Sequence, residues 1–144
     1  MERYLDLLEK VYIIFRVGAY SRNLRKEVVK NQKYYFWDNG IRNALSSNFN
    51  SLALRNDVGA LWENYVISER LKLQSYKKML SYNYFWRTYD GQEIDWIEER
   101  EGNLFAYEFK YNKEFAKIPA AFALAYPDNV FEVINSKNYL NFIT

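Results

Sequence analysis

"EIDWIEEREGNLFAYEFKYN", residues 93–112, decides the fold of this chain. Polar and apolar residues alternate on both sides of "EGN", which is the pattern of two antiparallel strands joined by a tight turn. Glu108 and Lys110 share one face of the second strand, and aromatic residues occupy its other face. A purely structural strand would more usually carry valine or isoleucine at such positions. The sequence therefore predicts a hairpin, and it raises the question of what role Asp95, Glu108 and Lys110 have there.

The register of the hairpin decides whether Asp95 lies beside these charges. A two-residue turn at residues 101 and 102 sets Asp95 opposite Glu108, and a turn one residue later sets it opposite Lys110. Opposed residues lie about 4.5 to 5.5 Å apart, so in either register one divalent cation could bridge both carboxylates. A slip by one residue would set Asp95 opposite Phe109, on the aromatic face, and no such site would exist.

The flanking sequence places the hairpin in a series of helices and strands. After it, residues 113–126 predict a helix, with Pro119 tolerated only near a first turn, and residues 130–135 predict a strand. Before it, the pattern predicts a helix at residues 2–11, a strand at 11–17, a strand followed by a short helix at 33–45, a helix at 56–73 and a strand at 82–89. Asp38 is expected to cap the short helix. The fold class is therefore α/β.

Two acids of the helix at residues 56–73 compete for a role at the hairpin. Glu63 lies at the border of the apolar stripe, near Arg70, and can reach towards a strand. Glu69 falls closer to the centre of the stripe, where a carboxylate requires a buried partner. We therefore expect Glu63 to face the hairpin and Glu69 to matter for stability.

The composition excludes several classes of chemistry. The 144 residues contain no histidine and no cysteine, which excludes serine–histidine–aspartate triads, cysteine nucleophiles, disulfides and ordinary zinc sites. No G-x-x-x-x-G-K-[ST] loop occurs, so no nucleotide site is expected. Catalysis would have to use carboxylates, lysine and an oxygen-liganded ion such as magnesium. Without a long apolar run or a signal peptide, we expect a cytoplasmic protein with no membrane contact.

Basic residues gather near the N-terminus, although the net charge of the chain is only +2. Six of them lie between positions 16 and 33 against the single acid Glu27: Arg16, Arg22, Arg25, Lys26, Lys30 and Lys33. Such a run could follow a phosphate backbone through Arg22, Arg25, Lys26 and Lys30. The alternative is a solvated surface that only keeps the protein soluble.

Two carboxylates and a lysine on one hairpin face suit phosphodiester cleavage. Magnesium bound by the carboxylates polarises phosphoryl oxygens and activates water, and a lysine orients that water or stabilises developing charge. The alternative is a surface salt bridge between Lys110 and one of the acids, worth ~0 to 1 kcal/mol.

An acid on a helix, then D, then E-x-K across a hairpin resembles the PD-(D/E)xK nuclease superfamily, and especially archaeal Holliday-junction resolvases. The residues that carry this resemblance are Glu63 in "LWENYV", Asp95 in "QEIDWI", and Glu108 and Lys110 in "YEFKYN". The proline that often precedes the aspartate is missing. The resemblance implies a restriction-endonuclease-like core of helix, three-strand antiparallel meander, helix and strand. It also implies a Mg or Mn site of Asp95, Glu108 and Glu63, with Lys110 and Glu63 in catalysis.

Nearly the whole chain resembles a wider family, the domain of unknown function 4143, found behind AAA+ ATPase modules. The stretches that carry this resemblance are "YLDLLEKVYIIFRVGAYSRNLRKEVVKNQKYYFWDNGIRNAL", "RNDVGALWENYVISERLK", "FWRTYDGQEIDWI" and "EFKYNK". The resemblance implies that residues 1–33 are the end of a winged helix with a basic β-wing, and residues 34–144 a nuclease-like domain. It implies further that the chain is a C-terminal piece whose partner is an N-terminal AAA+ ATPase module.

Two functions therefore stay open, with a purely structural role as the third alternative. The first is a metal-dependent DNA nuclease or resolvase. The second is a catalytically silent nuclease-fold module that binds DNA or regulates the ATPase. DNA is the expected partner in the first case, and the oligomeric state stays open, with a homo-oligomer among the alternatives.

Overall fold

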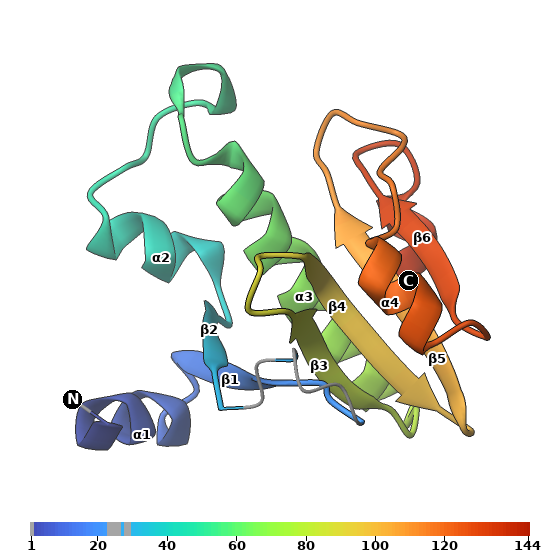
Figure 1. Cartoon of the computed structure of the whole chain (residues 1–144). Helices are drawn as coiled ribbons and strands as arrows, with labels where there is room; N and C mark the ends of the chain where they lie inside the picture. Colours follow the sequence, from blue (N-terminus) through green and yellow to red (C-terminus); the bar gives the residue numbers. More distant parts are fainter. Residues whose placement is uncertain (1, 23–26, 28–29) are drawn as a thin grey trace.

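The computed structural model describes residues 2–22, 27 and 30–144 (Figure 1). Six strands form one mixed sheet in the order β2-β1-β3-β4-β5-β6. The strands are β1 (Ile14–Ala19), β2 (Gln32–Phe36), β3 (Tyr82–Arg87), β4 (Glu93–Arg100), β5 (Asn103–Phe109) and β6 (Val130–Ile134). The helices are α1 (Glu2–Lys10), α2 (Asn39–Leu45), α3 (Val58–Tyr76), α4 (Ala120–Ala125) and α5 (Tyr139–Ile143), with a 3-10 turn η1 at Leu52–Leu54.

The sheet is mixed because a central antiparallel meander has a parallel neighbour on each side, β1 beside β3 and β6 beside β5. β3, β4 and β5 form an antiparallel meander, and β6 returns parallel to β5 after α4. β1 and β2 pair antiparallel, and β1 runs parallel to β3, so the N-terminal hairpin continues the same sheet. The predicted order of helix, three antiparallel strands, helix and strand is therefore present from α3 to β6.

The hairpin β4–β5 has the first of the two predicted registers. Glu101 and Gly102 form its turn with φ of 50° and 78°, and Arg100 pairs with Asn103. Two consecutive residues with positive φ match the twist of the strands, and glycine adopts this conformation without strain. The pairing of Trp96 with Tyr107 extends to place Asp95 opposite Glu108, not opposite Phe109. Of the two registers that the sequence left open, the structure has the one with the turn at residues 101 and 102.

Apolar side chains cover both faces of the sheet. One cluster joins Trp62, Val66 and Ile67 of α3 to Phe85 and Trp96 of the sheet. On the opposite face, Phe122 of α4 packs in a second cluster with Trp86, Ile94 and Ile97. Helices α3 and α4 therefore lie on opposite faces, and the hairpin that carries Asp95 is held between two cores.

Two elements differ from the sequence prediction. The helix expected at residues 113–126 is only Ala120–Ala125 and begins directly after Pro119. A residue before proline is disfavoured in the helical region, so the chain before Pro119 cannot continue the helix backwards. The short helix α5 was not predicted at all. By contrast, Asp38 does cap α2, because its carboxylate accepts a hydrogen bond from the Ile41 backbone N–H at 3.1 Å.

The amphipathic pattern predicted for α3 is also wrong. This helix buries the polar residues Asn64, Arg70 and Gln74 together with its apolar ones. Glu69 therefore does not point into an apolar arc; its carboxylate lies at the surface and pairs with the Lys72 ammonium at 2.6 Å. In the part of the chain that the structure describes, no helix has the length and apolar character needed to cross a membrane.

Candidate functional site

A β-bulge positions Asp95. The pairing of β4 with β3 shifts by one residue, so that Asp95 and Trp96 stand opposite the single residue Phe85. Because of this extra residue, Ile94 and Ile97 both pack into the cluster beneath α4, which strict alternation would forbid. A bulge interrupts the ladder and redirects a side chain, and bulges are frequent next to active sites.

The environment of Asp95 is unfavourable for its own negative charge. Burial, then the nearby carboxylates Glu63 and Glu108, raise the pKa of Asp95 from 3.8 to about 7. Two groups act in the opposite direction: the Phe109 backbone N–H, which donates to Asp95 Oδ2 at 2.9 Å, and the more distant Lys33 ammonium. Near neutral pH the carboxyl group of Asp95 is therefore poised between its two protonation states.

Glu63 approaches the same place from α3. Its Oε1 accepts a hydrogen bond from the Tyr35 hydroxyl at 2.6 Å and lies 3.6 Å from Lys33 Nζ. Lys33 also forms an ion pair with Glu93 at the start of β4. Burial, and then Glu63, raise the pKa of Tyr35, so that its hydroxyl stays a hydrogen-bond donor. The structure thus brings Glu63, not Glu69, to Asp95.

Glu108 and Lys110 form the outer part of the cluster. Lys110 Nζ lies 2.6 Å from Glu108 Oε1, and 40% of the Lys110 side chain is exposed, against 16% for Glu108. Burial lowers the pKa of Lys110, but Glu108 and then the charges of Asp95 and Glu63 raise it overall. The lysine is therefore a charged donor at the solvent side of the three acids.

We call this group of residues the acid cluster: Glu63, Glu93, Asp95, Glu108, Lys33 and Lys110. Four carboxylates stand against two ammonium groups, so the cluster carries excess negative charge when every acid is ionised. Its oxygen donors have the chemistry that magnesium and manganese prefer. As the side chains stand, however, no three acids in the described ranges converge closely enough to hold a metal ion. The donor chemistry fits a hard cation, whereas a closed cage is not formed.

Two members of this neighbourhood, Lys33 and Tyr35, were misassigned or missed from the sequence, and one residue that was expected here lies elsewhere. Lys33 was counted with the basic run, yet its ammonium lies between Glu63 and Glu93. Tyr35, two residues later on β2, was not considered. Arg70, the expected neighbour of Glu63, is instead bound elsewhere. The alternation of Lys33 and Tyr35 along one strand was a usable signal, but pairing β2 with this site needed the three-dimensional structure.

The structure describes two of the four residues predicted to bind nucleic acid, Arg22 and Lys30. Arg25 and Lys26 lie outside the described residues. Arg22 forms an ion pair with Glu99, and its backbone N–H donates to the Tyr126 hydroxyl at 3.2 Å. Lys30 is exposed. The positive charge of Arg22 is thus partly neutralised by a neighbouring acid.

Comparison with known proteins gives a family but no activity. Residues 58–137 match the family model described as Domain of unknown function (DUF4143), and residues 1–52 match a second, Domain of unknown function (DUF8612). The chain is similar to two curated proteins, Uncharacterized protein Mb2031c of Mycobacterium bovis and Uncharacterized protein Rv2008c of Mycobacterium tuberculosis. Each is 28% identical over 110 residues, which cover 75% of this chain and 24% of the relative. The chain thus spans about a quarter of the length of these relatives. No solved structure matches.

Proposed function

Because the chain belongs to the family described as Domain of unknown function (DUF4143), whose description gives no activity, we propose its function from the acid cluster: metal-dependent hydrolysis of DNA phosphodiester bonds. One observation carries this proposal. Asp95 is held on a bulge beside Glu63 and Glu108, and its pKa is raised to about 7. A divalent cation would remove this repulsion, since an opposite charge favours the ionised carboxylate.

Each residue of the cluster has a defined role in this proposal. Asp95 and Glu108 would hold Mg or Mn, and Glu63 would complete the shell directly or through a water molecule. The bound cation would polarise the phosphoryl group and lower the pKa of a water molecule. Lys110, already charged and partly exposed, would orient the attacking water or stabilise the charge that develops on the phosphate.

The residues behind Glu63 would fix its orientation. The Tyr35 hydroxyl donates to Glu63, and Lys33 lies between Glu63 and Glu93, so the acid is supported from β2 and β4 at once. Such supporting contacts fix ligand orientation in metal sites. The resemblance of Glu63, Asp95 and the Glu108–Lys110 pair to the PD-(D/E)xK pattern agrees with these roles.

A second candidate is favoured by a specific observation. Lys110 and Lys33 already pair with Glu108 and Glu63, and the acids do not form a closed cage in the described part of the chain. A cluster whose acids are partly neutralised by its own lysines would belong to a catalytically silent module that binds DNA or regulates an N-terminal AAA+ ATPase. The greater length of the curated relatives is compatible with such an additional module.

Cleavage of supercoiled plasmid and of a four-way DNA junction tests the two candidates. With Mg or Mn the parent protein is expected to nick both substrates, and Asp95→Asn and Glu108→Gln to be inactive. Lys110→Ala should keep metal binding and lose about 100-fold or more in cleavage rate, because its role is in the transition state. Lys117→Ala removes an exposed lysine seven residues away that has no role in either proposal, and it is the matched control.

The outcomes separate the candidates. A parent protein that binds the metal and cleaves neither substrate favours the silent module. A Lys110→Ala protein that cleaves at the parent rate removes the lysine from the proposed mechanism.

A further inference from the structure

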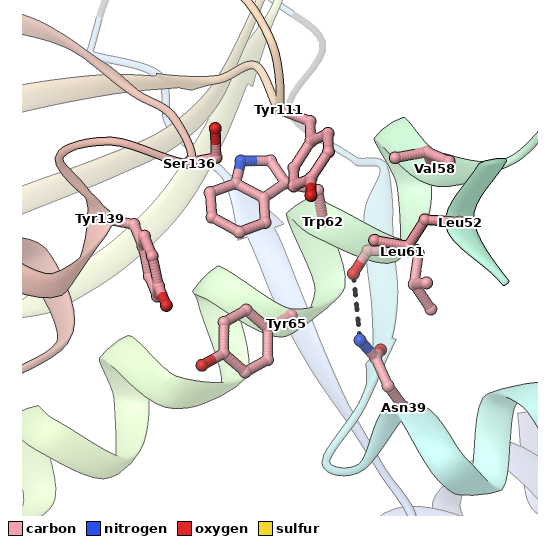
Figure 2. Close-up of a pocket in the computed structure, with 9 residues that line it drawn as sticks. All are labelled: Asn39, Leu52, Val58, Leu61, Trp62, Tyr65, Tyr111, Ser136 and Tyr139. Carbon is pink, nitrogen blue, oxygen red and sulfur yellow. Dashed lines mark hydrogen bonds between the residues drawn. The ribbon is translucent and has the colours of Figure 1, made fainter.

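A cavity of about 370 Å³ opens between α3 and the segments that follow β5 and β6, and four aromatic rings dominate its wall (Figure 2). Trp62 and Tyr65 come from α3, Tyr111 follows β5, and Tyr139 begins α5. We call this cavity the aromatic pocket. Its size falls within the range of small-molecule sites in proteins. Segments far apart in the sequence therefore meet to build one concave aromatic surface.

The rings are fixed by one another and by the backbone. Tyr111 and Tyr139 stand edge-on to Trp62, with ring centroids 5.3 and 5.2 Å away and interplanar angles of 65° and 74°. The Trp62 indole N–H donates to the Ile134 carbonyl at 3.4 Å, and only 8% of this residue is exposed. The tyrosines are only partly buried, so ring surface remains for a ligand. Figure 2 shows Tyr65, Tyr111 and Tyr139 arranged around Trp62.

The chemistry of the wall favours a neutral, planar ligand. None of the residues that line the pocket carries a charge. The charges that act on Tyr65 are Glu69 and Lys72, which neutralise each other at 2.6 Å. A metal ion or a phosphate would find no charged partner in the wall, whereas a flat aromatic ring can stack on tyrosine. The Ser136 hydroxyl at the rim offers a hydrogen bond to such a ring.

The pocket lies along the chain next to the acid cluster. Trp62 directly precedes Glu63 on α3, and Tyr111 directly follows Lys110 at the end of β5. Consecutive Cα atoms are about 3.8 Å apart, so the two sites share these segments. A strand with one base in the pocket would therefore contact the same two segments that carry Glu63 and Lys110.

Two lysines follow lining residues along the chain and offer positive charge to phosphates, although Glu114 partly neutralises one of them. Lys137 follows Ser136 and has 76% of its side chain exposed, and Lys113 lies two residues beyond Tyr111. The ion pair of Lys137 with Glu114 shows that the two loops lie side by side. Proteins that hold single strands combine aromatic rings that stack on bases with positive charge along the backbone.

We propose that the aromatic pocket binds an unpaired nucleobase of a DNA strand. The identity of the strand as substrate rests on the proposed function, but binding of the base does not require cleavage. The base would stack on Tyr65 or Tyr139, and its edge would reach the Ser136 hydroxyl. The domain would then prefer single-stranded or locally unpaired DNA to regular duplex.

Binding of matched oligonucleotides to the parent protein tests this proposal without any substitution. Fluorescence anisotropy in EDTA compares labelled oligothymidylate with an abasic strand of the same length and charge, and with duplex. The expected result is that oligothymidylate binds about 5- to 100-fold more tightly than the abasic strand. Equal affinity for the two strands overturns the proposal, since phosphate contacts alone would then account for binding.

Substitutions on two different elements locate the effect. Tyr65→Ala and Tyr139→Ala should each bring the affinity for oligothymidylate close to that for the abasic strand, while Tyr139→Phe should bind like the parent protein. Tyr76→Ala changes the same residue type on α3, but Tyr76 is 82% exposed and outside the pocket, so it is the control. Unchanged discrimination between the strands in both pocket variants overturns the assignment.

The same assay separates this inference from the proposed function and from another occupant. Base discrimination without metal-dependent cleavage contradicts the proposed function alone, and cleavage without base discrimination contradicts the aromatic pocket alone. If choline displaces bound oligothymidylate from the parent protein but not from Tyr139→Ala, a cation is the preferred occupant and the nucleobase assignment is wrong.

Discussion

Helix α3 and strand β4 meet in two charged clusters that differ in how well the charges are compensated. In the first, Glu98 is fully buried and accepts hydrogen bonds from Arg70 Nε at 2.6 Å and Arg70 Nη2 at 2.9 Å. Gln74 and the Trp96 indole donate to the same carboxylate at 2.9 and 3.1 Å. Arg70 also donates to the Phe142 carbonyl at 2.6 Å. This cluster is a closed structural network.

In the second cluster, Asp95 lies three residues away on the same strand and has the opposite environment. It accepts a hydrogen bond from the Phe109 backbone N–H, but the charges that act on it most strongly are the carboxylates Glu63 and Glu108. The comparison teaches that burial of an acid does not indicate function by itself. The uncompensated charge of Asp95 does, because perturbed titration in a concave, partly exposed site is typical of functional groups.

The largest expected effect is loss of the closed network. Glu98→Gln leaves the Arg70 guanidinium buried without its counter-ion, which should lower the free energy of unfolding by about 3 to 5 kcal/mol. Urea denaturation measures this change. The double variant Arg70→Met with Glu98→Leu should recover part of the loss, because it removes this pair of charges together but leaves Arg100, whose Nε lies 3.0 Å from Glu98 Oε2, without its acid. A loss below about 1 kcal/mol for Glu98→Gln would mean that Glu98 contributes no more to stability than a surface ion pair, and the contrast between the two clusters would not hold.

The next largest effect concerns the pH dependence of stability. The folded-state pKa of Asp95 is about 7, above its ordinary value of 3.8. Between these two pH values the carboxyl group is mostly protonated in the folded protein and mostly ionised in the unfolded chain. The contribution of the Asp95 carboxyl group to the free energy of unfolding is therefore fully present below about pH 4 and is lost as pH rises to about 7.

Metal-free unfolding curves at several pH values measure this slope. The parent protein should lose roughly 3 kcal/mol relative to Asp95→Asn across that range. Parallel pH profiles for the two proteins would show that the carboxyl group of Asp95 titrates normally.

The smallest effect separates two acids of α3. Glu69 pairs with Lys72 at the surface, so Glu69→Gln should change the free energy of unfolding by less than about 1 kcal/mol and leave metal affinity unchanged. Glu63→Gln should weaken metal binding measurably, because it removes an acid that acts on Asp95. Thermal unfolding with and without magnesium gives both quantities. A larger stability loss in Glu69→Gln than in Glu63→Gln would restore the assignment expected from the sequence.

Much of the fold followed from local patterns. The alternation in residues 93–112 was sufficient to predict the hairpin and to narrow the position of Asp95 to two registers, opposite Glu108 or opposite Lys110, and the structure has the turn at Glu101 and Gly102 that gives the first. These features are encoded within one hairpin, where the turn fixes the register. The extra residue of the bulge was not predictable, because strict alternation along the strand puts Ile94 and Ile97 on opposite faces, whereas in the folded sheet both pack on one face.

Sequence reasoning failed mainly in predicting which basic residues pair with the acids. Periodicity assumes that charged residues avoid the core, so Arg70 was expected near Glu63 although it is buried against Glu98. Glu69 was expected to be buried because an ideal helical repeat placed it near the centre of the apolar stripe, yet it pairs with Lys72. Lys33 approaches Glu63 from a strand about 30 residues earlier in the chain. Such long-range ion pairs depend on the whole sheet, and no local pattern specifies them.

The central claim is that the acid cluster takes up a divalent cation, and calorimetric titration with magnesium and manganese tests it most directly. The parent protein should bind one cation and release about half a proton per site at pH 7, because the metal displaces the proton from Asp95, which is about half protonated there. Glu132→Gln, which removes an exposed acid on β6, should bind like the parent, and Asp95→Asn should show no binding. Absence of binding by the parent protein, or equal binding by Asp95→Asn, would contradict the account.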